Sequence, residues 1–118
     1  MSYKLIYKFY PGFLSQMKKY NDKYKHLKNF KELKKEVILA LQTSPRKYVP
    51  LNAHPLHGNM KGFWSISTGL NSNRDRVIYA IDDESKLIYL KSIGDHSVYE
   101  SMLDYWKENE IIWLMKNG

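Results

Sequence analysis

The chain has 118 residues, of which 43% are hydrophobic and 26% charged, and its formal net charge is +7 at pH 7. This length and ordinary composition predict one compact domain and argue against wholesale disorder. The absence of cysteine excludes disulfide scaffolds and thiolate chemistry. No apolar run approaches the roughly 20 residues of a membrane span and the first ten residues lack a signal-peptide core, so we expect a cytoplasmic protein with no membrane partner.

The positive charge lies in the first half of the chain. Residues 1–50 hold twelve lysines and arginines against three acidic residues, whereas residues 51–118 hold seven against nine. A polyanion such as RNA, an acidic protein partner and a solvated lysine-rich helix face all fit this distribution.

The first half predicts a strand followed by two helices. Residues 4–9 are aromatic and β-prone, and Pro11-Gly12 ends that strand. Two apolar stripes at helical spacing follow, so we expect two amphipathic helices packed as a hairpin. The stripes are Phe13, Leu14, Met17, Tyr20 and Tyr24, then Phe30, Leu33, Val37 and Leu41.

The second half predicts an ordered loop, three strands and a last helix. Residues 44–62 are rich in proline and glycine, and β-prone runs follow at 63–68, 76–81 and 87–93. The Asp82–Ser85 segment reads as a hairpin turn. Ser97 opens a capping box for the last helix. The order β-α-α-β-β-β-α predicts an α+β domain with helices on one face of a largely antiparallel sheet.

Three residues are candidates for chemistry on their positions alone. His96 follows a predicted strand end, where a histidine can transfer protons near neutral pH or simply lie at the surface. Arg76 begins a strand and either clamps a phosphate or protects a sheet edge. Tyr99 either stacks on a base or belongs to the core. His54 and His57 lack further ligands, so we expect no metal site.

Four segments together resemble a toxin family. The segment from His54 to Phe63 looks like the HPLxGxxKGY segment of YafQ-type toxins, and Arg76–Ile81 resembles the RLVYxV strand of RelE and YoeB. Ile93–Ser97 is similar to the strand end of YafQ relatives, and Ser97–Glu100 resembles the SxVY segment of RelE. The resemblance covers about residues 1–105, so we expect a single RelE-like domain over 1–118 with a C-terminal extension at roughly 105–118.

The resemblance implies a toxin of a type II toxin–antitoxin pair. Such toxins cut mRNA in the ribosomal A site without a metal or other cofactor, leaving a 2′,3′-cyclic phosphate. The implied partners are an antitoxin, the ribosome and mRNA, with operator DNA reached only through the antitoxin complex. A ParE-like gyrase poison is one alternative. A catalytically decayed binding module is another, because Ser65 and Ser67 stand where many relatives carry charged residues.

The resemblance also assigns roles to individual residues. His96 would be the general acid and His54 the base, Arg76 would hold the scissile phosphate, and Tyr99 would stack on a base. Asp75 would replace the family's acidic residue. The implied RNA-binding residues are Lys61, Arg74, Trp64 and Lys91.

Overall fold

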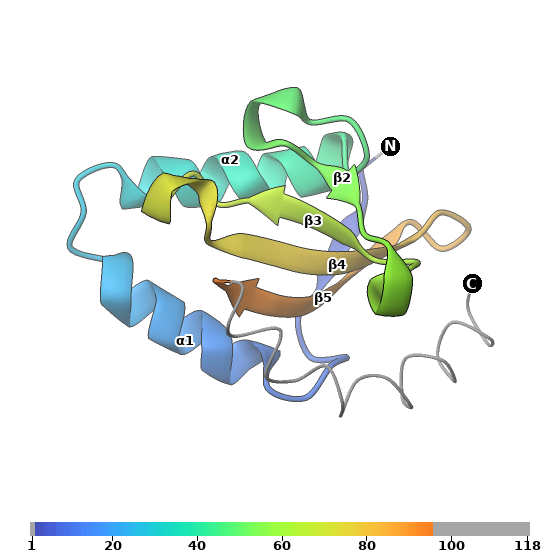
Figure 1. Cartoon of the computed structure of the whole chain (residues 1–118), viewed down its shortest axis with the longest axis horizontal. Coiled ribbons are helices and arrows are strands. Elements are labelled where there is room, and N and C mark those ends of the chain that lie inside the picture. Colours follow the sequence, from blue (N-terminus) through green and yellow to red (C-terminus); the bar gives the residue numbers. More distant parts are fainter. Residues whose placement is uncertain (1, 96–118) are drawn as a thin grey trace.

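A five-stranded sheet forms the centre of the molecule in this computed structural model, which describes residues 2–95 (Figure 1). The strand order is β1-β5-β4-β3-β2; β1 pairs with β5 in parallel and the other pairs are antiparallel. The strands are β1 (Lys4–Ile6), β2 (His54–Pro55), β3 (Trp64–Ser67), β4 (Arg76–Asp82) and β5 (Leu87–Gly94). The predicted α+β class is confirmed, whereas the expected last helix lies outside the described residues.

Two helices cover one face of this sheet. Helix α1 (Phe13–Tyr24) packs along β5, and α2 (Phe30–Thr43) approaches β1. Both begin and end close to the predicted stripes, because their buried residues recur at helical spacing. The main core joins these helices to the inner side of the strands. Its buried members include Phe13, Val37, Ala40, Leu41, Ile66, Val77, Tyr79, Ile88 and Leu90.

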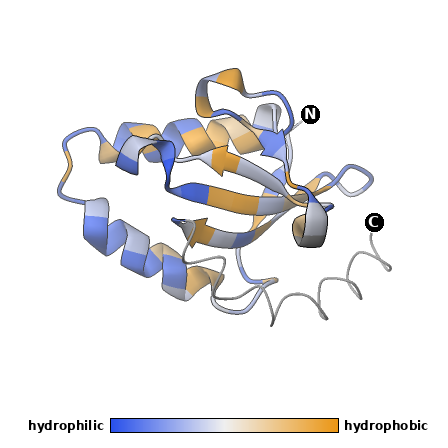
Figure 2. Ribbon diagram, viewed as in Figure 1, coloured by the Kyte–Doolittle hydropathy of each residue, from blue (hydrophilic) through white to orange (hydrophobic). Residues whose placement is uncertain are grey.

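An apolar cavity of about 350 Å³ lies between the two helices and the sheet. Its lining comes from both helices and from β1, β5 and β4, and includes Met17, Tyr20, Leu33, Val37, Val77 and Leu90. In Figure 2, hydrophobic residues occupy the middle of β4 and parts of α2, whereas the visible side of α1 is largely hydrophilic. Neither helix is long and apolar enough to cross a membrane, within the part of the chain that the structure describes.

A second, smaller cluster lies on the other face of the sheet. Phe63, Ile78, Ala80 and Met60 are buried there, with Tyr10, Leu56 and Tyr89 packed against them. The ring of Tyr10 lies 6.1 Å from that of Phe63, centroid to centroid. Among residues 2–95, loops and the short 3-10 helix Gly58–Met60, rather than α-helices, provide the cover on this face.

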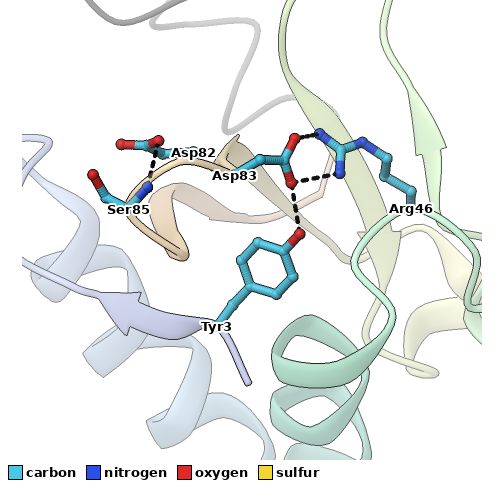
Figure 3. A network of polar contacts seen from close by, with 5 residues as sticks. All are labelled: Tyr3, Arg46, Asp82, Asp83 and Ser85. Atoms are coloured by element: carbon cyan, nitrogen blue, oxygen red, sulfur yellow. Dashed lines mark hydrogen bonds and ion pairs between the residues drawn. The ribbon is translucent and has the colours of Figure 1, made fainter. Parts of the chain in front are cut away.

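A polar network lies at the end of the sheet where β4 turns into β5 (Figure 3). Arg46 donates two hydrogen bonds to the Asp83 carboxylate, at 2.9 and 2.6 Å, and the Tyr3 hydroxyl donates a third at 2.6 Å. These donors, with Arg46 the larger influence, lower the pKa of Asp83 to about 2. The network joins the N-terminal segment, the loop after α2 and the β4–β5 turn, which confirms the hairpin predicted at Asp82–Ser85.

Candidate active site

Three strands bring His54, Ser65 and Arg76 to one small cavity. His54 on β2 pairs with Ser65 on β3, and Ser67 on β3 pairs with Arg76 on β4. The cavity has a volume of about 110 Å³. Its lining residues are His54, Leu56, Ser65, Arg74, Arg76, Ile78 and Gly94. Because Leu56 and Ile78 also belong to the smaller cluster, the cavity lies on the sheet face away from α1 and α2.

The guanidinium of Arg76 is held by oxygens from three segments. Its Nε donates to the Ser65 hydroxyl, Nη1 donates to the Asn73 carbonyl at 3.3 Å, and Nη2 donates to the Asn52 carbonyl at 3.0 Å. The side chain is half-buried. A fixed, permanently charged and planar donor of this kind suits recognition of a phosphate group.

His54 lies directly beside this arginine. Its Nδ1 is 3.3 Å from Nη2 of Arg76 and 2.8 Å from the carbonyl oxygen of Asn52. The imidazole therefore lines the cavity within reach of anything that Arg76 binds. A proton-transfer group next to a cation offers two of the functions that acid–base chemistry on a phosphodiester uses.

Ser65 and Ser67 position their neighbours, a role that the sequence analysis missed. The Ser65 hydroxyl accepts the hydrogen bond from Arg76 Nε. The Ser67 hydroxyl donates to the Asn73 side chain at 2.8 Å and accepts from the Gly69 N–H at 2.9 Å. Both serines are 1% exposed. Their alternation with Trp64 and Ile66 along β3 correctly predicted their face, and it was the available signal for this role.

Asp75 lies on the opposite side from Arg76. It is 3% exposed, accepts a hydrogen bond from Asn71 Nδ2 at 3.2 Å, and interacts with the hydroxyl of Tyr24 on α1. Burial, followed by the hydrogen bond to Asp75, raises the pKa of Tyr24 to about 12. Neighbouring residues of a strand point to opposite faces, so Asp75 is turned toward α1 while Arg76 is turned toward the cavity.

The other residues with a predicted RNA-binding role are dispersed. Arg74 lines the cavity, and Lys61 is exposed on the loop between β2 and β3. Trp64 packs against the main core, with the guanidinium of Arg46 5.7 Å from its ring centroid. His96 and Tyr99 lie outside the described residues.

Lys91 is almost completely buried beneath the same sheet face. Ile78 pairs with Ser92 and Tyr79 pairs with Leu90, so Lys91 is the extra residue of a β-bulge. Its ammonium group lies 4.2 Å from the ring centroid of Tyr10 and 4.9 Å from that of Phe63. Burial lowers the pKa of Lys91 to about 6. The side chain is 1% exposed, so it is not available at the surface for the RNA contact that the sequence predicted.

Comparison with solved structures identifies the fold. A YoeB/ParE toxin from Agrobacterium tumefaciens aligns with 79% of this chain and 98% of its own, at 17% identity and a TM-score of 0.58. YafQ from E. coli strain BL21(DE3) aligns with 82% and 97%, at 18% identity and a TM-score of 0.58. The YoeB–YefM complex from Staphylococcus aureus gives 79% and 93%, at 16% identity and a TM-score of 0.53. No family model and no curated protein matches the sequence.

The chain has the fold of the YoeB and YafQ toxins. Within this fold the segments that resemble family motifs lie near one another: His54-Pro55 of the HPL segment form β2, the RVIY segment lies in β4, and Ile93-Gly94 end β5. Arg76 pairs directly with Gly94 across β4 and β5. The chain therefore leaves β5 at the cavity, and His96 is the second residue after Gly94 in the sequence.

Proposed function

We propose that this chain is the toxin of a type II toxin–antitoxin pair and a ribosome-dependent endoribonuclease that cuts mRNA by metal-independent acid–base catalysis. The observation that carries the proposal is the meeting of His54 and Arg76 in one cavity. The fold that this chain shares with the YoeB/ParE and YafQ structures also supports it. In this chain, Arg76 at the start of β4 pairs with Gly94 at the end of β5.

The reaction needs one base, one acid and a cation. His54 removes the proton of the ribose 2′-hydroxyl, and the resulting oxygen attacks the adjacent phosphorus. The bond from phosphorus to the 5′-oxygen breaks, and His96 protonates that leaving oxygen. The products are a 2′,3′-cyclic phosphate and a 5′-hydroxyl end. Arg76 stabilises the additional negative charge that develops on the phosphoryl oxygens.

Neighbouring side chains would hold the RNA in this position. Arg74, at the rim of the cavity, and Lys61, on the adjacent loop, are placed to contact backbone phosphates. Tyr99 supplies a ring that stacks on a base. Lys91 is too deeply buried for direct contact in this conformation and would act by supporting the sheet face.

The lysines of α1 and α2 would bind ribosomal RNA. They are exposed on the side of the helices away from the core, and include Lys18, Lys19, Lys23, Lys31 and Lys35. Phosphate contacts release counterions, so ribosome binding should weaken steeply between about 50 and 200 mM salt. A salt response that is flat in a ribosome co-sedimentation assay would argue against this surface.

An antitoxin is the other expected partner. The solved YoeB–YefM complex has the same toxin fold in complex with a second protein. The basic first half of this chain favours an acidic segment in such a partner. A toxin that acts on translating ribosomes would work in the cytoplasm, and operator DNA would be contacted through the partner.

The deciding experiment maps message ends in a reconstituted translation reaction. The wild-type protein, His54→Gln, His96→Ala and Arg76→Ala would be compared, with Arg46→Ala as a matched arginine control outside the cavity. Cuts that need ribosomes, that persist in Arg46→Ala and that are strongly reduced in the other variants support the proposal. Intact mRNA with DNA breaks after induction would instead identify a gyrase poison. Absence of both, with antitoxin binding retained, would identify a binding module.

A further inference from the structure

One main-chain oxygen contacts both side chains of the candidate site. The carbonyl oxygen of Asn52 lies 2.8 Å from Nδ1 of His54 and 3.0 Å from Nη2 of Arg76. The side chain of Asn52 is exposed and plays no part in either contact. The backbone at position 52 therefore sets the position of the proton-transfer group and of the cation together.

The local chain conformation aims this carbonyl. Asn52 ends the short 3-10 helix Val49–Leu51 in the left-handed region, at φ 50° and ψ 54°. Its N–H donates to the Val49 carbonyl at 2.9 Å, and the Ala53 N–H donates to the Tyr48 carbonyl at 3.1 Å. Leu51, which is buried in the main core, anchors the segment. Asparagine and glycine adopt this conformation more readily than other residues.

The contact with Asn52 distinguishes the two neutral forms of His54. A carbonyl oxygen can accept a hydrogen bond but cannot donate one, so the 2.8 Å contact is a hydrogen bond only when Nδ1 carries the proton. With the proton on Nε2 instead, the lone pair of Nδ1 would point at the carbonyl oxygen of Asn52, which is unfavourable. Nδ1 could then accept a hydrogen bond only from Nη2 of Arg76, at 3.3 Å. The shorter contact favours the first form, in which Nε2 is unprotonated. The bond made by one ring nitrogen commonly fixes the state of the other in this way.

We propose that the Asn52 carbonyl is the positioning group of this site: it holds His54 with the proton on Nδ1, so that Nε2 serves as the base, and it fixes Arg76 next to it. The inference rests on the proposed ribonuclease function for the role of Nε2. The protonation pattern of His54 itself does not depend on that function, so the two can fail separately.

The first test is nitrogen-15 NMR of the full chain without RNA, at a pH where His54 is neutral. Long-range proton–nitrogen correlations distinguish the two neutral forms, and a His54→Gln sample assigns the signals of His54 among the four histidines. We expect His54 with its proton on Nδ1. A proton on Nε2 would overturn the inference, whatever the protein does to RNA.

The second test changes the backbone preference at position 52. Asn52→Gly keeps the carbonyl and accepts the left-handed conformation, whereas the β-branched Asn52→Val resists it. We expect the Nδ1 proton in the glycine variant and its loss in the valine variant. Cleavage by the valine variant should be roughly tenfold or more below that of the glycine variant, part of the about 10²–10⁴-fold that a positioned base supplies.

Thermal unfolding of both variants identifies a general loss of structure. If the folded valine variant keeps the Nδ1 proton and cleaves as fast as the glycine variant, the inference fails. If the valine variant does not fold, the NMR measurement on the wild type and the glycine variant decides. If both show the Nδ1 proton but neither cleaves RNA, the position of His54 stands and the proposed function fails.

Discussion

The two faces of the central sheet carry different kinds of side chain. The face beneath α1 and α2 buries large apolar side chains such as Phe13, Ile66 and Leu90, and its cavity has an apolar lining. The other face carries His54 and Arg76, whose side chains are in contact. The larger apolar core therefore lies on one face, and the candidate chemistry lies on the other beside a smaller apolar cluster. Changes on the two faces should have separable effects on folding and on RNA cleavage.

Removing a core ring should cause the largest loss of stability. Phe13 is 2% exposed in the main core, so Phe13→Ala should lower the free energy of unfolding by about 3–5 kcal/mol. Its neighbour Leu14 is 42% exposed on the same helix turn, so Leu14→Ala should change that free energy by no more than about 0.5 kcal/mol. Urea unfolding measures both. Equal losses would show that α1 does not pack as described.

Removing the cation on the other face should impair activity and leave the fold intact. Arg76→Ala should reduce RNA cleavage by about 10²–10³-fold, because a preorganised charge beside the phosphate is lost. Arg76→Lys should recover part of that loss, since it restores the charge without the planar fork. Cleavage rates and urea midpoints would be measured on the same samples. If Arg76→Ala lost cleavage only because it unfolds more readily than the wild type, the two faces would not have separate effects on stability and cleavage.

Lys91 tests whether a buried lysine on the face that carries His54 and Arg76 lowers the stability of the protein. The folded state resists protonation of this lysine until about pH 6, whereas the unfolded chain takes up the proton below about pH 10.5. Wild-type stability should therefore fall as the pH drops from about 10 to about 6, and then stay level with respect to this group. Lys91→Met should raise the free energy of unfolding by about 2 kcal/mol at pH 7.

The same variant separates a structural role of Lys91 from a functional one. Its advantage over the wild type should shrink as the pH rises toward about 10, which denaturation at pH 6.5 and 9.5 would reveal. A less stable Lys91→Met at both pH values would mean that the buried amine is a net stabilising group. A stable variant with impaired cleavage would assign Lys91 to the site's function.

The smallest effect on stability is expected in the network of Tyr3, Arg46 and Asp83. Asp83 has a lowered pKa of about 2, so its contribution is complete above the unfolded value near 3.8 and is lost as the pH falls through about 2. The carboxylate is about half exposed, at 54%, so Asp83→Asn should lower the free energy of unfolding by less than about 1 kcal/mol at pH 6. Glu84→Gln, in the same turn, is the matched control. A difference from wild type that is as large at pH 2 as at pH 6 would contradict this account.

The sequence predicted the regular elements well, because their signals are local. The alternation in Trp64–Ser67 placed two residues on each face, and the apolar spacing of α1 and α2 located both helices. The two-residue strand β2 was not predicted, because it exists through pairing with β3 rather than through its own composition. RNA-binding and catalytic roles for the residues of the cavity remain predictions.

The arrangement around the cavity depended on contacts that no local pattern contains. Adjacent residues Asp75 and Arg76 look equally available in the sequence, but strand alternation turns them to opposite sides of the sheet. The bulge at Lys91 depends on how β4 and β5 are paired along their whole length. The Asn52 carbonyl carries no side-chain signal at all, although it contacts both His54 and Arg76.

The parallel pairing of β1 with β5 also governs when the molecule can be completed. Lys4 is paired with Leu87, so β1 can pair only after β5 has been synthesised, about 80 residues later. Until then, the inner sides of α1 and α2 have no sheet to cover. Long-range pairing of this kind slows folding and prolongs the exposure of apolar surface. A nascent chain would therefore expose the apolar sides of both helices for much of its synthesis, before β5 is available to pair with β1.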